Sequence, residues 1–259
     1  MFMYCGISTT FWGFMFGSFF GDAVNVIATT FFNRPDIRLA PLWFEPVSLP
    51  MKLLVFAFGL GILHLFIGLG IKFYSCVKNG SLADGIYDAI FWYMLVGCGI
   101  VYLLTMSMFT EMLGLTFTLP AVAGTVAAYA AAIGFVGIVL TSGRESKNWV
   151  KRILKGLYGA YGVSSYLSDI LSYSRLLALG LATSVISTVF NKMGSMMGGS
   201  IPGAIIFILV FLIGHSLNLA INALGAYVHT NRLQFVEFFG KFYEGGGRKF
   251  EPFAIHTKY

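Results

Sequence analysis

Charged side chains are scarce in this sequence of 259 residues. Only 11% are Asp, Glu, Lys or Arg, whereas 57% are hydrophobic. A soluble domain usually carries about 25% charged residues. The deficit leaves too little polar surface to cover a water-soluble globule, so the composition predicts an all-α polytopic membrane protein whose helices cross the bilayer.

The sequence also lacks the motifs of common enzymes and metal proteins. Cys5, Cys76 and Cys98 show no CxxC spacing, which argues against a disulfide framework or a zinc site. There is no Walker A motif, nucleophile elbow or metal cluster, and the glycines 245–247 lack the strand and helix of a phosphate loop. We therefore expect no bound cofactor or metal and no catalysis of bond chemistry by this chain alone.

The net charge of +6 has two explanations. It could indicate nucleic-acid binding, but a membrane protein with basic cytoplasmic loops gives the same balance. The second explanation fits the hydrophobic composition, so we expect contact with membrane lipid and no nucleic acid.

Six membrane-spanning helices are predicted, the last two of them long. They cover residues 2–21, 51–74, 84–109, 118–141, 157–192 and 202–240. About 20 residues suffice to cross a bilayer, so we expect the last two spans to be tilted, kinked or protruding into water. Glycines at short intervals in the first two spans predict close helix packing. The start has no basic n-region or cleavage site, so it is interpreted as a span and not as a cleavable signal peptide.

The basic residues orient the predicted bundle with both ends of the chain in the cytoplasm. In that orientation four basic residues lie outside: Arg34, Arg38, Lys52 and Lys192. Those inside are Lys72, Lys78, Arg144, Lys147, Lys151, Arg152, Lys155, Lys241, Arg248, Lys249 and Lys258. This asymmetry has the direction that the positive-inside rule requires.

Arg175 lies in the middle of the fifth predicted span. On a helix with 100° per residue, Ser164, Ser168 and Ser172 fall within about 60° of it. Arg175 would be about 25 Å from either end of the span, too far for its side chain of about 7 Å to reach the headgroups. Charges inside a membrane most often mark function, so the serine stripe predicts a hydrated path to Arg175.

The sixth predicted span carries a second polar stripe. His215, Asn218, Asn222, His229 and Arg232 fall within a sector of about 100°. Two neighbouring long helices, each with polar residues and an arginine, suggest a hydrated pathway.

Structural interpretations of the same residues stay open. Arg175 could pair with Asp169 or with backbone carbonyls and hold the bundle together, although Asp169 lies about 120° away on the helix. Arg232, nearer the cytoplasmic end, could serve as an anchor. The two asparagines could join helices by hydrogen bonds, as amides often do within membranes.

Two motifs in these helices resemble a known family. Residues Ser172–Thr183 resemble its motif SYLRLWALSLAH, and His229–Glu237 resemble HSLRLHWVE. The closing YEGGGRKFEPF is similar to its GxGxxYEPF region, and GISTTFWGFMFGSFFGD near the start is similar to an early span. The family is subunit I of prokaryotic V/A-type ATPases, with the V-ATPase a subunit as eukaryotic counterpart.

The resemblance covers essentially the whole chain but only the C-terminal membrane part of the subunit. It implies that a large N-terminal cytoplasmic domain and a first membrane hairpin are not included in this sequence. Residues 1–259 would then form the transmembrane stator domain, with 157–192 and 202–240 as the ion-pathway helices.

The family resemblance implies a mechanism. The subunit would be a stator in a prokaryotic cell membrane, beside a rotating ring of c/K-type proteolipid subunits and bound to the peripheral and central stalks. Arg175 matches the essential arginine, which lowers the pKa of an arriving ring carboxylate and separates two ion half-channels. Arginine suits this role because it stays charged. Arg232 matches the second arginine, with His229 beside it.

Three positions depart from the eukaryotic pattern. Thr183, Asn222 and Tyr161 stand where eukaryotic members carry titratable groups. The remaining hydroxyls and amides suit protons or sodium equally well, so the transported ion, H⁺ or Na⁺, stays open.

Two other functions compete with the stator interpretation. A secondary transporter with a midplane substrate site would commonly show internal repeats, which this sequence lacks. A purely structural membrane anchor would tolerate Arg175→Ala, whereas a stator would not.

Overall fold

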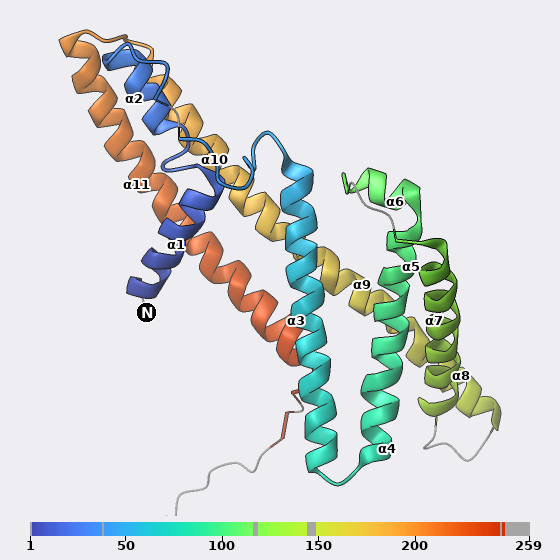
Figure 1. The fold of residues 1–259 in the computed structure, drawn as a ribbon. Helices are drawn as coiled ribbons and strands as arrows, with labels where there is room; N and C mark the ends of the chain where they lie inside the picture. Colours follow the sequence, from blue (N-terminus) through green and yellow to red (C-terminus); the bar gives the residue numbers. More distant parts are fainter. Residues whose placement is uncertain (1, 38, 116–118, 144–148, 244, 247–259) are drawn as a thin grey trace, which may run out of the picture.

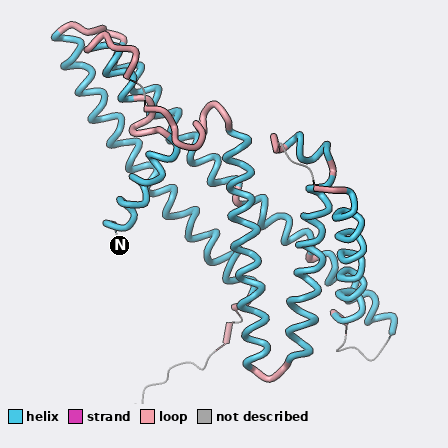
Figure 2. The backbone as a smooth tube through the Cα atoms, viewed as in Figure 1, coloured by secondary structure: helices cyan, strands magenta, loops and turns pink. Residues whose placement is uncertain are grey.

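The architecture is that of a computed structural model, which describes residues 2–37, 39–115, 119–143, 149–243, 245 and 246. Within these ranges helices joined by loops form the chain, and no strand belongs to a sheet (Figure 2). This confirms the predicted all-α membrane fold. The elements in chain order are α1 (Phe2–Phe16), α2 (Ala23–Phe31), α3 (Pro50–Lys78), α4 (Leu82–Gly85), η1 (Ile86–Ile90), η2 (Tyr93–Gly97), α5 (Cys98–Thr105), α6 (Ser107–Met112), α7 (Ala121–Thr141), α8 (Trp149–Tyr161), α9 (Val163–Ser172), α10 (Ser174–Ser195), α11 (Ile201–Arg232), η3 (Leu233–Phe238) and η4 (Phe239–Lys241) (Figure 1).

Five helical stretches of the described residues are long and apolar enough to cross a membrane. They are Pro50–Lys78, Leu82–Thr105, Ala121–Thr141, Val150–Ser195 and Ile201–Lys241. The second of these joins α4, two π-helical turns (η1 and η2) and α5. Successive stretches run in opposite directions, so the loops between them alternate between the two ends of the bundle (Figure 1). Each predicted span from residue 51 onward thus coincides with one of these stretches. The third ends at Thr105, because the backbone of Met106 is extended, and residue 118 of the fourth lies outside the described residues.

The first predicted span, 2–21, is shorter than expected. Its helix α1 has 15 residues and ends at Phe16. The backbone then enters the left-handed region at Gly17 (φ 64°), Phe20 (φ 51°) and Gly21 (φ 71°), which no right-handed helix can contain. At Gly17 an added Cβ would lie 2.7 Å from the backbone of Pro41, so the loop also needs glycine for close approach.

The last two stretches confirm the prediction of long final spans. They contain 46 and 41 residues, about 69 and 62 Å of helix at 1.5 Å per residue. A hydrocarbon core of about 30 Å is far shorter, so these helices must tilt or protrude. In Figure 1, α10 and α11 run obliquely, whereas α3 and α5 stand more upright.

The fifth span is interrupted, whereas the prediction had assumed one continuous helix over 157–192. It is helical from Trp149 and has turns at Gly162 and Tyr173, which separate α8, α9 and α10. At the second turn the N–H of Tyr173 donates to the carbonyl of Ile170, three residues back, in place of the usual four. This tighter turn stands two residues before Arg175.

Helices α10 and α11 form the most extensive contact between two elements (Figure 1). Small residues allow the approach: a Cβ on Gly214 would lie 2.5 Å from the ring of Phe190, and one on Gly194 would lie 3.0 Å from Phe207. Glycines commonly serve membrane helix packing in this way. Ser200 caps the start of α11 by accepting the N–H of Gly203 at 3.3 Å.

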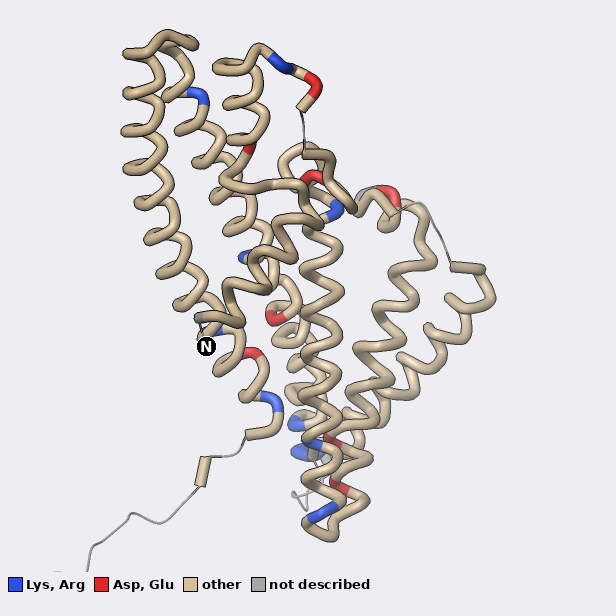
Figure 3. Tube along the Cα trace, turned by 60° about the vertical axis from the view of Figure 1, so that its left-hand side comes forward, with Lys and Arg blue, Asp and Glu red and all other residues tan. Residues whose placement is uncertain are grey.

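Charged residues are absent from α11 until its last residue, Arg232. Figure 3 shows long uncharged stretches of helix, with Lys, Arg, Asp and Glu gathered mainly toward the ends of the bundle. Part of the orientation argument lies outside the described residues: Arg38, Arg144, Lys147, Arg248, Lys249 and Lys258. The cytoplasmic placement of both ends therefore stays a prediction.

Helix α3 presents a buried stripe with nearly four-residue spacing to the junction of α9 and α10. The stripe is Leu53, Ala57, Gly61, Leu65 and Leu69. Gly61 faces Tyr173, the residue at the turn. The turn before Arg175 thus packs directly against the backbone of α3.

We predict that Gly61→Ala destabilises the protein. Its Cβ would lie 2.8 Å from the Tyr173 ring, and overpacking of about 1–3 kcal/mol outweighs the helix propensity gained, at most about 1 kcal/mol. The measurement is the melting temperature of the chain in lipid nanodiscs. Gly59→Ala is the matched control, because nothing lies within 4 Å of its Cβ. Equal melting temperatures for the two variants would contradict this packing.

Candidate functional site

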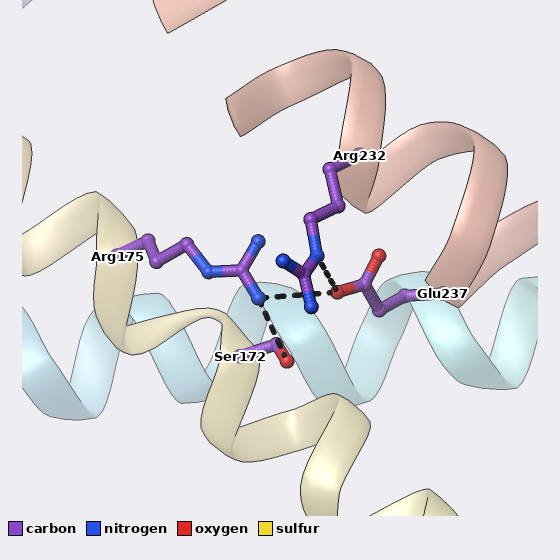
Figure 4. A network of polar contacts seen from close by, with 4 residues as sticks. All are labelled: Ser172, Arg175, Arg232 and Glu237. Atoms are coloured by element: carbon purple, nitrogen blue, oxygen red, sulfur yellow. Dashed lines mark hydrogen bonds and ion pairs between the residues drawn. The ribbon is translucent and has the colours of Figure 1, made fainter. Parts of the chain in front are cut away.

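Four side chains form a polar group where α9, α10 and η3 meet; we call it the arginine cluster (Figure 4). Arg175 Nη2 lies 3.5 Å from Glu237 Oε1 and donates to Ser172 Oγ at 3.2 Å. Arg232 Nε lies 3.9 Å from the same Glu237 oxygen. Both arginines of the two sequence motifs therefore converge on one carboxylate.

Local backbone features place these four residues. The tight turn at Tyr173 separates Ser172 from Arg175, and the π-helix η3 follows directly after Arg232 and contains Glu237. A π-helix adds one residue per turn compared with the common repeat, and such turns are frequent at functional sites. The irregular backbone here turns Glu237 inward.

Helix α3 supports both features through one histidine. His64 Nδ1 lies 2.6 Å from the hydroxyl oxygen of Tyr173, and its ring stacks on Phe238 with centroids 4.1 Å apart. His64 therefore links the turn before Arg175 to the π-helix that holds Glu237.

Burial within the arginine cluster is uneven. The Glu237 side chain is 2% exposed, that of Arg175 23% and that of Arg232 62%. Two guanidinium groups and one carboxylate leave a formal net charge of +1. Glu237 Oε2 and Arg175 Nη1 are buried without a hydrogen-bond partner among the described residues. The buried Nη1 of Arg175 can thus still donate a hydrogen bond.

A second ion pair lies beside the arginine cluster. Lys241 pairs with Asp169, and both side chains are largely buried. The Lys241 ammonium also lies 3.9 Å from the centre of the Tyr166 ring, which stacks on Trp92. Asp169 therefore pairs with Lys241, and the carboxylate beside Arg175 is Glu237.

A chain of hydrogen bonds connects α10 and α11 farther along; we call it the amide network. Thr183 Oγ1 donates to Asn222 Oδ1 at 2.6 Å, and Asn222 Nδ2 donates to Asn218 Oδ1 at 2.6 Å. Asn218 Nδ2 donates in turn to Ser187 Oγ at 2.8 Å. The polar stripe of α11 thus faces α10.

The amide network continues toward α2. His215 Nε2 lies 2.9 Å from Asn191 Oδ1, and Asn191 Nδ2 donates to Asp22 Oδ1 at 3.0 Å and to the Phe20 carbonyl at 2.7 Å. Asn191 is 1% exposed and His215 5%. This extension ties both long helices to the loop between α1 and α2.

A cavity of about 370 Å³ adjoins α10 at Ser184 and Thr188. It is large enough for several water molecules. Asn25 Oδ1, in its wall, is buried without a hydrogen-bond partner among the described residues. Its polar lining residues are Ser18, Asp22, Asn25, Glu45, Ser184 and Thr188.

The structure distributes the predicted site residues over four locations. Ser172, Arg175 and Arg232 lie in the arginine cluster, and His215, Asn218 and Asn222 lie in the amide network. Ser164 and Ser168 are exposed on α9, and His229 is half-buried one turn before Arg232. Within the described residues, no group of three or more His, Cys, Asp or Glu could hold a metal ion.

Glu237 was missed as a site residue by sequence reasoning. A signal existed, because it is the only acidic residue of the sequence between Asp169 and Glu244. Lys241, Ser187 and Asn191 were also not predicted as site residues.

Comparison with known proteins gives a family. The sequence model of the V-type ATPase 116kDa subunit family matches residues 163–255, which include both motifs. A-type ATP synthase subunit I of Methanocaldococcus jannaschii is 34% identical over 98% of this chain and 38% of its own length. The Pyrococcus horikoshii protein of the same name is 33% identical over 97% of this chain and 35% of its own.

A bacterial relative is matched over a shorter range. V-type ATP synthase subunit I of Chlamydia pneumoniae is 28% identical over 64% of this chain and 24% of its own length. The chain spans about a third of the length of the archaeal relatives.

We predict that reversing either charge of the Asp169–Lys241 pair destabilises the protein, and that exchanging both restores stability. Asp169→Lys or Lys241→Asp leaves two like charges in a largely buried place, at a cost of about 3 kcal/mol. The double exchange places opposite charges together again. Melting temperatures in nanodiscs measure the effect, and a double variant no better than the worse single variant would contradict it.

Proposed function

Because the chain belongs to the V-type ATPase 116kDa subunit family, we propose that it is a stator of the membrane sector of a rotary V/A-type ATPase. In this role it provides two ion half-channels and a fixed positive charge beside a rotating ring. The ion is H⁺ or Na⁺, and its movement is coupled to ATP hydrolysis or synthesis on other subunits.

The observation that carries this proposal is the state of Arg175. Its guanidinium is held by Ser172 and Glu237, yet Nη1 has no hydrogen-bond partner among the described residues. The side chain as a whole is 23% exposed while Nη1 itself is buried, so an external carboxylate reaches this nitrogen once the side chain turns. A buried donor without a partner is costly, and a carboxylate is the acceptor that a guanidinium fork binds best.

The ion-transfer step follows from this geometry. A ring carboxylate that arrives beside Arg175 meets a positive charge at low dielectric, which favours its ionised form and releases its ion. Arg175 stays protonated at any relevant pH, so it does not itself pass protons on. A fixed guanidinium also repels cations that would cross directly from one half-channel to the other.

The two half-channels are assigned to polar regions on opposite sides of Arg175. One includes the amide network residues His215, Asn218 and Asn222 and the cavity beside α2. The other includes Ser164, Ser168 and Ser172 on α9, with His229 near the end of α11. The break at Tyr173 separates the serines of α9 from α10.

The outer faces of α10 and α11 are apolar, which suits a ring of hydrophobic subunits. Val185 and Val189 on α10 and Ile221, Leu224 and Val228 on α11 are all exposed. The proposed partners are the c/K-type ring, the peripheral and central stalks and membrane lipid. The proposed location is a prokaryotic cell membrane, with both ends of this chain cytoplasmic.

We predict that Arg175→Ala abolishes coupled ion pumping while the complex still assembles. Without the guanidinium the ring carboxylate keeps its ion, and pumping should fall at least about 100-fold, as for a lost charge contact of about 3 kcal/mol. The measurement is ATP-driven ion uptake in liposomes containing the complex, with and without Na⁺.

Arg34→Ala is the matched control, because Arg34 is an exposed arginine of the loop after α2. It should pump like the wild type. Coupled pumping by an assembled Arg175→Ala complex would return Arg175 to a structural role and contradict the proposed function.

A further inference from the structure

Glu237 is the most deeply buried acidic side chain among the described residues, at 2% exposed. Its Oε1 lies between both arginines, 3.5 Å from Arg175 and 3.9 Å from Arg232. One carboxylate oxygen therefore lies close to two guanidinium groups from different helices (Figure 4).

The two unpartnered atoms of the arginine cluster show that this arrangement is incomplete. Glu237 Oε2 can accept a hydrogen bond, and Arg175 Nη1 can donate one, yet neither has a partner among the described residues. Buried polar atoms are nearly always satisfied in folded proteins. The described residues therefore supply no partner for Nη1, whereas Oε2 lies close to two guanidinium groups (Figure 4).

Arg232 has the freedom to act as the second holder of Glu237. Its side chain is 62% exposed, and its contact with Oε1 is the longer of the two. If Arg175 turns toward an external carboxylate, Arg232 can close on Glu237. A buried carboxylate left alone would be strongly unfavourable, so a second arginine keeps it ionised.

We propose that Glu237 is a positioning residue of ion transfer, whose charge holds Arg175 and weakens its attraction for the ring carboxylate, while Arg232 holds Glu237 during the exchange. The inference rests on the proposed function. Without Glu237, the ring carboxylate would meet the unopposed charge of two arginines. It would release its ion more readily and rebind it less well.

Other charged and titratable groups around Glu237 come from three helices. Tyr173 lies within electrostatic reach of Glu237 and Asp169, and Asp169 is paired with Lys241. His64 on α3 contacts Tyr173. All of them stay in place in the variants below, so differences between variants report the charges of Glu237 and Arg232.

The test is the ion affinity of the assembled complex in liposomes, measured as ATP-driven uptake against pH and against Na⁺ concentration. Glu237→Gln removes one negative charge about 8 Å from an arriving carboxylate. At an effective dielectric constant of about 20, this shifts the alkaline limb of the pH profile by about 1.5 units to lower pH. For a Na⁺ pump the half-saturating Na⁺ concentration rises about 30-fold.

Two further variants test whether the direction of the shift in the pH profile follows the sign of the charge that is removed. Arg232→Gln removes a positive charge and should shift the profile the opposite way. The double variant with both glutamines leaves Arg175 alone with the original net charge of +1, so its profile should return toward that of the wild type. Glu237→Asp, which keeps the charge, should keep the wild-type midpoint. Glu111→Gln, at an exposed position of α6, is the matched control.

A purely structural Glu237 predicts another pattern. Glu237→Gln would then lower the amount of assembled complex and leave the midpoint unchanged, and this result would overturn the inference. If Glu237→Gln alone does not assemble, the test compares the midpoint of the pH profile of Arg232→Gln with that of the double variant. Equal midpoints would overturn the inference. Arg175→Ala distinguishes failure of the proposed function from failure of this inference. Coupled pumping by Arg175→Ala would contradict the proposed function, whereas an unchanged pH profile of Glu237→Gln would contradict only this inference.

Discussion

The burial of a guanidinium in an apolar bundle is the constraint on which the surrounding structure depends. Arg175 lies 25 and 20 residues from the two ends of the helical stretch Val150–Ser195, about 37 and 30 Å, so its charge needs partners within the protein. Glu237 provides a carboxylate, and Ser172 provides a hydroxyl. The turn at Tyr173 and the π-helix after Arg232 bring these groups together, and α3 packs against both.

Helix α3 has a larger role than its apolar sequence indicates. Gly61 admits the Tyr173 ring, and His64 bonds to that residue and stacks on Phe238. Stability and function are thereby linked, because a change in α3 reaches Arg175 through Tyr173 and Glu237 through Phe238. Farther along, the amide network joins α10 to α11, and its side chains take one another as hydrogen-bond partners.

The spans from residue 51 onward could be predicted because hydropathy is a local signal. An isolated charge is also a local signal and singles out Arg175, whose role in ion transfer stays a prediction. The contact of Ser172 with Arg175 also followed from helical spacing. Ser168 and Ser164 did not join them in one contact group, because they precede Arg175 by about 10 and 16 Å of helix, beyond the reach of its side chain. Glu237 could not be placed, since a regular helix gives no sign of the π-helical turn, and the early end of α1 depends on left-handed residues at Gly17, Phe20 and Gly21.

The central claim is that Arg175 faces a ring carboxylate across the outer surface of α10 and α11. A cryo-EM structure of the complete complex in lipid tests it most directly, through the distance from Arg175 Nη1 to the nearest ring carboxylate. The account predicts that one ring carboxylate lies within about 6 Å of that atom, the range in which opposite charges shift an ionisation equilibrium. A ring that packs on another face, with Arg175 directed only toward Glu237, would contradict it.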